Sequence, residues 1–310
     1  MAGQCAFQRR YRQSQGRDSC VPRTGTSARV FQWFQAGYFE VISSGVLGII
    51  AGGGKFPVML AEAARSKGLR VAAVAHIGET DQAIADSADT LEWVKLGQFG
   101  KIVHSLKRRG VSRALMAGTI TKKRMFSSVM PDLKALSMLG NLAVFHDDDI
   151  LTTVAEALSR EGIEIVSSTF LLPELLAPPG IITRRKPDKT ELKDIEFGWR
   201  IVKEVGRLDI GQCVVVRRRT VLAVEAIEGT DEAIMRGGRL AVEKAVVVKA
   251  SKPQQDLRFD VPTIGLQTVI TMKEAGASVL AVEAGKTLIF DREEMTAFAD
   301  SAKISIVARS

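Results

Sequence analysis

Short apolar runs alternate with amphipathic segments through the first half of the chain, and this alternation predicts strands and helices in turn. Residues 46–51 form an apolar run typical of a buried parallel strand. Residues 56–67 carry apolar side chains at helical spacing and end at Gly68, a common helix stop. Residues 70–75 are the next apolar run. This order of strand, glycine turn, helix and strand predicts a βαβ unit.

The alternation continues as far as residue 166. Residues 100–109, 132–145 and 148–160 predict helices, and residues 114–117 and 163–166 predict strands. Such alternation favours a mostly parallel sheet that binds ligands at the carboxyl ends of its strands. The fold class expected for the first half is therefore an α/β, Rossmann-like domain with a parallel sheet.

A polar stretch with several prolines, residues 177–190, predicts a linker before a second domain. Beyond it, residues 191–205 and 265–275 predict helices, and residues 213–217 and 221–226 predict a hairpin. Glu283 closes a further strand, and Asp291 is placed to cap the last helix. These patterns predict a distinct α+β C-terminal domain over 191–310, after an N-terminal domain over 46–176.

The first 45 residues lack any periodicity, and they contain six arginines but only two acids. They have no apolar segment of the kind found in secretory signals. Three interpretations remain open: translated upstream sequence with the true start at Val46, a disordered native tail, or an organelle transit peptide. In each case the fold begins near Val46, where the composition changes abruptly.

The charge and the numbers of cysteine and histidine residues exclude several classes of protein. Of the net charge of +8, about half comes from those first 45 residues, so the remainder of the 310-residue chain is only mildly basic. This argues against a nucleic-acid binder and suits an enzyme with an anionic substrate. The three cysteines and three histidines form no close pair, which excludes a thiolate zinc site and a disulfide framework. Any metal would be a hard cation held by carboxylates. The longest apolar stretch is too short to span a bilayer.

The glycine turn at Gly52, Gly53 and Gly54 only partly matches a dinucleotide-binding motif. Pro57 stands at the third glycine position, and His76 stands near the place of the acid that would bind a ribose. A general role remains, in which glycine lets backbone N–H groups approach an anion at a helix N-terminus. The alternative is a purely structural tight turn.

Residues 225–231 contain three acids around a glycine, and acidic and basic residues interleave in residues 249–260. Carboxylates hold Mg²⁺ with its waters, and basic side chains neutralise charge on a transferring phosphorus centre. A carboxylate can also orient or deprotonate the attacking water. The combination suits phosphoryl transfer, although exposed ion pairs on a solvated surface are the alternative interpretation.

Several stretches, in order, make the chain from about Val46 onward resemble the UDP-2,3-diacylglucosamine pyrophosphatases of the LpxI type. They are GIIAGGGKFP (48–57), LGQFGKI (96–102), AGT (117–119), MPD (130–132), EVGRLDIGQ (204–212), VEAIEGTD (224–231), KASKPQQDLRFDVPTIG (249–265) and VEAGKTLIFDRE (282–293). Their length and their spread over the whole body make this resemblance far more specific than a lone glycine loop.

The resemblance implies hydrolysis of the pyrophosphate bond of UDP-2,3-diacylglucosamine, by water attack at the sugar-side phosphorus. We expect the active site to lie in a cleft between the two domains. The products would be UMP and 2,3-diacylglucosamine 1-phosphate, in lipid A synthesis. It also implies Mg²⁺ or another divalent cation such as Mn²⁺, a catalytic C-terminal domain and a homodimer. We expect a cytoplasmic protein with no nucleic-acid partner and, at most, peripheral membrane contact through its lipid-linked substrate.

The resemblance also implies site residues. The family's catalytic aspartate lies in R-F-D-x-P-x-I-G, which corresponds to Asp260; its role would be water activation, metal binding or both. Further residues are candidates from their place in the matching stretches. They are Glu228, Asp231 and Asp209 for the metal, Lys249, Lys252 and Arg258 for the pyrophosphate, and Gly52, Gly53 and Gly54 for the ligand cleft. The alternatives for these are turn, cap and surface ion-pair roles.

Three weaker expectations and two rival functions also follow from the sequence. Asp132 is expected to cap a helix, and so are Asp147 and Asp148, because His146 replaces an expected glycine beside them. The acyl chains need an apolar groove, for which the candidates are Met125, Phe126, Val129 and Met130. The rivals are a nicotinamide-dependent oxidoreductase and a non-catalytic nucleotide or lipid carrier.

Overall fold

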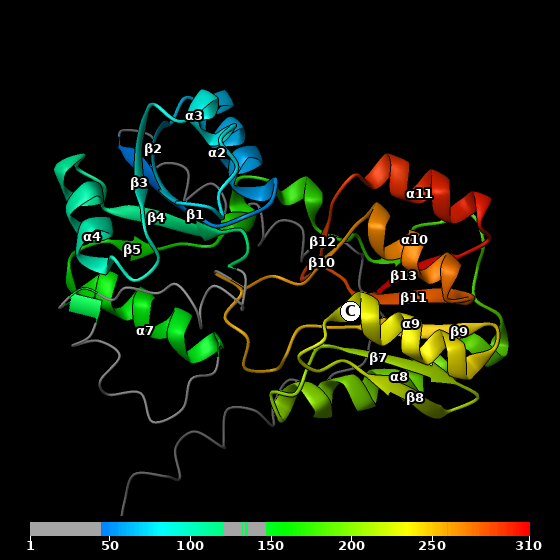
Figure 1. Ribbon diagram of the computed structural model, residues 1–310. Coiled ribbons are helices and arrows are strands. Elements are labelled where there is room, and N and C mark those ends of the chain that lie inside the picture. The colour runs from blue at the N-terminus through cyan, green and yellow to red at the C-terminus, as the bar shows by residue number, and fades with distance from the viewer. Residues whose placement is uncertain (1–44, 121–131, 133, 136–146, 259) are drawn as a thin grey trace, which may run out of the picture. The chain divides into compact units, whose positions relative to one another are not determined.

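A computed structural model describes residues 45–120, 132, 134–135, 147–258 and 260–310 (Figure 1). The elements of its N-terminal half are, in chain order, β1 Val46–Ala51, α2 Phe56–Ser66, β2 Arg70–His76, α3 Ile84–Ser87, β3 Thr90–Val94, α4 Phe99–Arg108, β4 Arg113–Ala117, α7 Asp147–Arg160 and β5 Glu164–Ile165, followed by the 3₁₀ turns η1 Ser168–Phe170 and η2 Pro173–Leu175. Most of the expected helices and strands are therefore present, with ends shifted by a residue or two.

The five strands form one parallel sheet in the order β3-β2-β1-β4-β5. This is the strand order of the first five strands of a doubly wound sheet, so the predicted parallel sheet is confirmed. Successive side chains of β1 point to opposite faces, as strand geometry requires. Ile49 packs with Leu60 of α2 on one face, and Ile50 packs with Val103 of α4 and Leu158 of α7 on the other.

The C-terminal half follows after Ala177. Its elements are β6 Gly180–Ile181, α8 Lys189–Arg207, β7 Cys213–Arg217, β8 Thr220–Val224, α9 Thr230–Ala241, β9 Ala245–Lys249, β10 Thr263–Ile264, α10 Leu266–Glu274, β11 Ala277–Glu283, β12 Leu288–Ile289, α11 Arg292–Ser301 and β13 Ser305–Arg309. A mixed sheet has the order β6-β13-β11-β9-β7-β8, and β10 pairs with β12 in a separate two-stranded sheet. The distinct C-terminal α+β unit is thus confirmed.

Helices cover both faces of the mixed sheet, with α9, α10 and α11 on one side and α8 on the other (Figure 1). Alternation along β7 explains both layers. Val215 packs with Ile234 of α9, whereas Val214 and Val216 pack with the apolar side of α8 that includes Val202. The central strands are buried on both faces, which is why their sequences read as continuous apolar runs.

Three expectations about helix ends have different outcomes. Asp132 accepts hydrogen bonds from the backbone N–H of Ala135 at 2.9 Å and of Gly100 at 2.7 Å, which confirms its capping role. Asp291 occupies the N-cap position of α11, as predicted, but its backbone is left-handed (φ 48°) and its side chain makes no capping bond. The helix predicted from residue 191 begins at Lys189, because Asp188 and Glu191 form a capping box.

The segment expected to be a linker contains β6, whose Gly180 and Ile181 pair antiparallel with β13. This short strand was not predicted, since two residues give no usable periodicity. No helix in the described part of the chain is both long and apolar enough to cross a membrane. The tail 1–44 and the groove candidates Met125, Phe126, Val129 and Met130 lie outside the described residues, as do the side chains of Asp147 and Asp148.

The tip of the β7–β8 hairpin has an unusual backbone. Arg218 and Arg219 form a two-residue loop in which both have positive φ, 48° and 58°. Hairpins select this geometry for its twist, but they usually place Asn and Gly there. Here the buried carboxylate of Asp194 accepts from the N–H groups of Arg218 at 2.8 Å and Arg219 at 2.6 Å. These bonds offset the strain of the two left-handed residues.

Candidate active site

One edge of the C-terminal sheet gathers most of the residues singled out from the sequence. Lys249 ends β9, directly opposite Cys213 at the start of β7 and Val282 near the end of β11. Because β7 runs antiparallel to β9, the segment before β7 meets the loop that follows β9. Asp209 and Lys252 come from these two segments, and Glu228 and Asp231 follow β8 at the same edge.

Lys249 lies at the centre of a chain of hydrogen bonds. Its side chain is buried (7% exposed), and Nζ donates to Thr230 Oγ1 at 3.1 Å and to Thr263 O at 3.0 Å. Thr230 in turn donates to Glu225 Oε1 at 2.8 Å. An ammonium has three N–H donors, and the contacts among described residues occupy two. Thr230 opens α9, so Lys249 lies beside a helix N-terminus, where an anion is favoured.

Lys252 and Asp209 are brought together as an ion pair. Lys252 Nζ lies 2.6 Å from Asp209 Oδ1, and both side chains are largely buried. Asp209 has a left-handed backbone (φ 57°) in the connection between α8 and β7. This contact agrees with the ion-pair alternative for Lys252. A metal role for Asp209 and a pyrophosphate role for Lys252 stay predictions.

Asp260 is partly exposed, and two hydrogen bonds join it to residues of its own loop. Its backbone N–H donates to Asp256 O at 3.1 Å, which closes a turn. Its Oδ2 accepts a hydrogen bond from Gln255 Nε2. Gln255 is buried, and its Oε1 accepts from the backbone N–H of Lys252 at 2.9 Å. One loop therefore carries Lys252, Gln255 and Asp260 in a connected arrangement.

Arg258 bonds to the neighbouring carboxylate of Asp256. Its Nε and Nη2 donate to Asp256 at 2.9 and 2.6 Å, and this pairing lowers the pKa of Asp256. The fork-to-carboxylate geometry is a typical arginine contact. It shows how Arg258 is oriented in the chain as folded, and its predicted contact with a pyrophosphate stays a prediction.

Glu228 and Asp231 lie in the turn and first helical turn after β8. Glu228 accepts from the N–H of Ala226 at 3.1 Å and pairs with Arg236. Backbone hydrogen bonding and the Arg236 contact lower its pKa. Asp231 is exposed in the first turn of α9, where a carboxylate interacts favourably with the helix dipole. These contacts agree with the turn and cap alternatives, and the metal role of both residues stays a prediction.

The side chains near Asp260 determine which mode of divalent-cation binding this site could support. Within the described ranges, no three or more His, Cys, Asp or Glu side chains are grouped as a metal site would require. Mg²⁺, however, keeps several waters and is often held by one or two carboxylates together with substrate phosphates. A single partly exposed carboxylate at Asp260 fits that mode of binding. It does not fit a cage built entirely from protein ligands.

Glu283 anchors the start of the Asp260 loop, and it is a residue for which no site role was predicted from the sequence. Its Oε2 accepts from Ser251 Oγ at 2.6 Å, from Ser251 N at 3.1 Å and from Lys203 Nζ at 2.7 Å. Burial raises the pKa of Glu283, but the hydrogen bonds from Lys203 and Ser251 outweigh burial and lower the pKa to about 2. A charged residue ending a buried apolar strand was the available signal. Gln255 was also missed as a site residue. Glu225 and Thr230 lie in the acidic stretch 225–231 that was singled out, but neither was assigned a role of its own.

Two backbone N–H groups of the glycine turn in the N-terminal domain bond within the domain. Gly52 N donates to Ala117 O at 2.8 Å, and Gly53 N donates to Thr119 O at 2.7 Å. A Cβ on Gly52 would lie 2.7 Å from Thr119 O, and Gly54 has φ +86°. Close packing on the turn after β4 therefore accounts for Gly52, as the structural alternative proposed. The predicted role of these glycines in a ligand cleft is untested.

His76 is also accounted for by packing. Its ring Nδ1 lies 2.9 Å from Ala51 O, and burial lowers its pKa. A buried imidazole replaces the carboxylate that dinucleotide-binding domains direct at a ribose.

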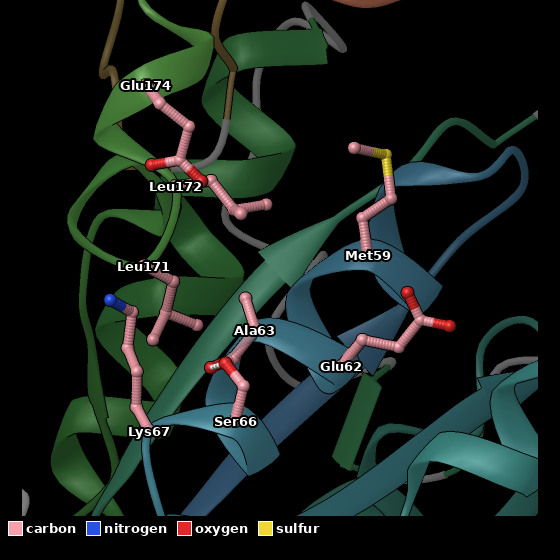
Figure 2. Close-up of a pocket in the computed structure, with 8 residues that line it drawn as sticks. All are labelled: Met59, Glu62, Ala63, Ser66, Lys67, Leu171, Leu172 and Glu174. Carbon is pink, nitrogen blue, oxygen red and sulfur yellow. Dashed lines mark hydrogen bonds between the residues drawn. The ribbon is translucent and has the colours of Figure 1, made fainter.

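A groove of about 340 Å³ lies in the N-terminal domain between α2 and the turns η1 and η2 (Figure 2). It is lined by Met59, Glu62, Ala63, Ser66, Lys67, Leu171, Leu172 and Glu174. Figure 2 shows Met59 and Glu62 on one wall and Leu172 on the facing wall. None of the site residues predicted from the sequence lines this groove.

Comparisons with known proteins place the chain in a family. Residues 46–175 match the LpxI N-terminal domain, and residues 178–307 match the LpxI C-terminal domain. The chain is 36% identical, over 272 residues, to a protein named UDP-2,3-diacylglucosamine pyrophosphatase LpxI from Caulobacter vibrioides (strain ATCC 19089 / CIP 103742 / CB 15), covering 84% of this chain and 96% of that protein. A solved structure described as "Crystal structure of gox2253" shares only 11% identity with a TM-score of 0.29, over 86% of this chain and 89% of that one. The two domain matches and the 36% identity show that the chain belongs to the LpxI family.

Proposed function

We propose that the chain hydrolyses the pyrophosphate bond of UDP-2,3-diacylglucosamine to UMP and 2,3-diacylglucosamine 1-phosphate. The observation that supports this best is the 36% identity to the Caulobacter pyrophosphatase over nearly its whole length. The partly exposed Asp260 carboxylate, held in a loop with basic residues, supplies groups that such a reaction requires. The reaction belongs to lipid A synthesis.

The chemistry of this step follows from the charges involved. Water attacks the sugar-side phosphorus, an O–P bond forms there, and the bridging oxygen leaves with UMP. Asp260 orients the attacking water and accepts its proton, the role of a general base. Lys249 lies beside a helix N-terminus, and its contacts with described residues use two of its three N–H donors. It neutralises charge on the pyrophosphate. Lys252 and Arg258 are further cations within the same stretch of chain.

A divalent cation, Mg²⁺ or Mn²⁺, is part of the proposal. Asp260, together with the substrate's phosphate oxygens, would hold the metal, and Glu228, Asp231 and Asp209 remain candidate ligands. When bound, the cation supplies positive charge that stabilises the phosphorus centre during transfer. We also propose a homodimer, catalysis in a cleft between the domains, and a cytoplasmic location with at most peripheral contact to the inner membrane face.

The test is release of UMP from UDP-2,3-diacylglucosamine by the full chain, with Mg²⁺, with Mn²⁺ and with EDTA. The substitution Asp260→Asn keeps the size of the side chain and removes its charge. We expect metal-dependent release that falls by about 10³-fold in this variant, since general-base catalysis contributes on the order of 10²–10⁴.

Asp256→Asn is the matched control, because Asp256 is a carboxylate of the same loop that pairs with Arg258. We expect this control to retain most of the activity. Release that survives Asp260→Asn would keep the reaction and reject the proposed role of Asp260. Binding of the substrate with no release would favour a carrier, and tight NADH binding without release would favour an oxidoreductase.

A further inference from the structure

Gln255 is a buried amide whose two ends meet different partners. Gln255 is only 8% exposed, although glutamine is usually found on protein surfaces. Burying an amide costs free energy unless its polar atoms are hydrogen-bonded. The carbonyl Oε1 accepts from the backbone N–H of Lys252 at 2.9 Å, and Nε2 donates to Asp260 Oδ2. Both ends of the side chain are therefore paired within the loop that carries Asp260.

The orientation of this amide follows from its partners. The backbone N–H of Lys252 can only donate, so the end that faces it must be the carbonyl oxygen. The opposite end is then the NH₂ group, a donor that matches the carboxylate acceptor of Asp260. Among side chains of this length, only glutamine offers an acceptor and a donor together.

The loop is also held in place near its first residues, so the backbone to which Gln255 bonds is fixed. Ser251 is bonded through both its backbone N–H and its hydroxyl to Glu283. The next residue, Lys252, is paired with Asp209 at 2.6 Å. The contact from Gln255 thus links the carboxylate of Asp260 to the anchored part of the loop.

We propose that Gln255 is a positioning residue that holds one oxygen of Asp260 and so sets the direction of its carboxylate. The inference rests on the proposed function, in which Asp260 carries the reaction. A carboxylate acts on a bound water or cation only when its oxygens point at that position. Partners behind reacting or metal-binding groups have effects of about 10- to 100-fold when removed.

The decisive substitution is Gln255→Glu, measured in the full chain with UDP-2,3-diacylglucosamine. Glutamate keeps an acceptor for the Lys252 N–H but replaces the donor to Asp260 with a second carboxylate. We expect kcat to fall by about 10- to 100-fold, while KM changes by less than about threefold, because the groups assigned to bind the pyrophosphate stay in place. Gln255→Met, which removes both polar ends without adding charge, should also lower kcat.

Gln254→Glu is the matched control. Gln254 is exposed and its Nε2 donates to Gly206 O at 2.8 Å, so the same substitution one residue away does not touch Asp260. We expect kcat within twofold of the unmodified chain. The thermal midpoint of each variant, taken from circular dichroism, shows whether the chain is folded in the assay.

A second measurement does not depend on turnover. Urea unfolding of Gln255→Met, Asp260→Ala and the double variant forms a double-mutant cycle. If the two side chains interact, the combined effect on the unfolding constant will differ from the product of the single effects by at least about twofold. If the two effects are independent, the contact between Gln255 and Asp260 contributes nothing measurable to the free energy of unfolding.

The outcomes separate the inference from the proposed function. An unmodified chain that releases no UMP overturns both. An active chain in which folded Gln255→Glu keeps kcat within twofold overturns the inference alone. A variant that loses activity through KM alone, or through unfolding at the assay temperature, shows a structural role and also overturns the positioning role.

Discussion

Lys203 Nζ lies 2.7 Å from Glu283 Oε2, so an ion pair joins the C-terminal part of α8 to the end of β11. The same Glu283 oxygen accepts from Ser251, and Lys203 also donates to Ser251 O at 3.0 Å. The pair therefore ties the sheet and α8 to Ser251, near the start of the loop that carries Asp260. Glu283 is a structural support for the candidate site, 80 residues away in sequence from its lysine.

Removing this buried charge is expected to destabilise the chain in a way that depends on pH. Hydrogen bonds hold the pKa of Glu283 at about 2, against an ordinary value of 4.5. A depressed folded pKa stabilises the fold fully above 4.5 and progressively less as pH falls toward 2. The shift corresponds to about 3 kcal/mol, of which about 2 kcal/mol is lost by pH 3. Urea unfolding of the unmodified chain and Glu283→Gln should therefore differ most at pH 7 and converge toward pH 3.

Glu196→Gln is the control for that experiment. Glu196 pairs with Arg309 at 2.7 Å, but its side chain is 60% exposed, so solvent screens the pair. We expect a much smaller change in unfolding free energy at every pH. Equal effects of the two substitutions would show that burial of Glu283 adds nothing to its ion pair.

The hairpin tip offers a substitution that should stabilise the fold. Arg218 and Arg219 both have left-handed backbones, which cost about 1–2 kcal/mol per ordinary residue. Replacing them by Asn and Gly supplies the residues that this turn prefers. We expect Arg218→Asn with Arg219→Gly to raise the unfolding free energy by about 1 kcal/mol in urea.

Alanine at both positions provides the comparison, since it removes the same charges but keeps the backbone strain. The gain should be absent in Arg218→Ala with Arg219→Ala. If the alanine pair stabilises the chain equally, the benefit comes from charge removal and the strain argument fails.

Gly52 and Gly54 should respond differently to substitution. A Cβ on Gly52 would lie 2.7 Å from the backbone oxygen of Thr119, whereas nothing lies within 4 Å of a Cβ on Gly54. Gly52→Ala is expected to cost about 1–3 kcal/mol through overpacking. Gly54→Asn should be nearly neutral, because asparagine tolerates positive φ. A stable Gly52→Ala variant that has lost only substrate affinity would instead favour a ligand role.

Lys249→Met tests the buried lysine beside α9. Methionine preserves much of the volume but removes the charge and the donor available to a phosphate. A charge-assisted hydrogen bond contributes about 1.5–3 kcal/mol, so kcat/KM should fall by about 10- to 100-fold. Lys286→Met is the control, because Lys286 is half exposed and pairs with Glu283. If both variants lose kcat/KM to a similar extent, the activity depends on positive charge in the region and not on Lys249 in particular.

Cys213 should be inert in the folded chain. It is fully buried at the start of β7, and burial raises the pKa of its thiol. The thiolate is the reactive form, so both access and ionisation are suppressed. In a variant with Cys5→Ser and Cys20→Ser, Ellman's reagent should detect no thiol at pH 8 until guanidinium exposes one. A fast reaction under native conditions would contradict the burial.

The parts of the fold that were predictable are those whose residues are buried on both faces. The expected strands 46–51 and 213–217 coincide with β1 and β7, since continuous apolar runs mark central strands. β3 was missed because Glu92 and Trp93 interrupt its apolar pattern at the edge of the sheet. α9 was missed because its first turn carries acids that were interpreted as site chemistry.

The contacts within the candidate site were harder to predict from the sequence than the fold was. Asp260 and Lys252 were singled out by a motif, but their partners are set by tertiary packing. Asp209 lies 43 residues from Lys252 along the chain, and no periodicity reports such a pairing. Gln255 was not singled out because a glutamine in a polar loop is usually exposed, and its burial appears only when the loop is folded.

The way Asp194 holds the hairpin tip separates conformation from side-chain identity. Its carboxylate bonds to the backbone N–H groups of residues 218 and 219, which every amino acid except proline provides. The shape of the turn is thus specified from inside the domain, while the two exposed side chains are left free to change. Relatives could diverge at this tip without losing the hairpin, and a spectroscopic label placed there should report on the C-terminal domain without disturbing it.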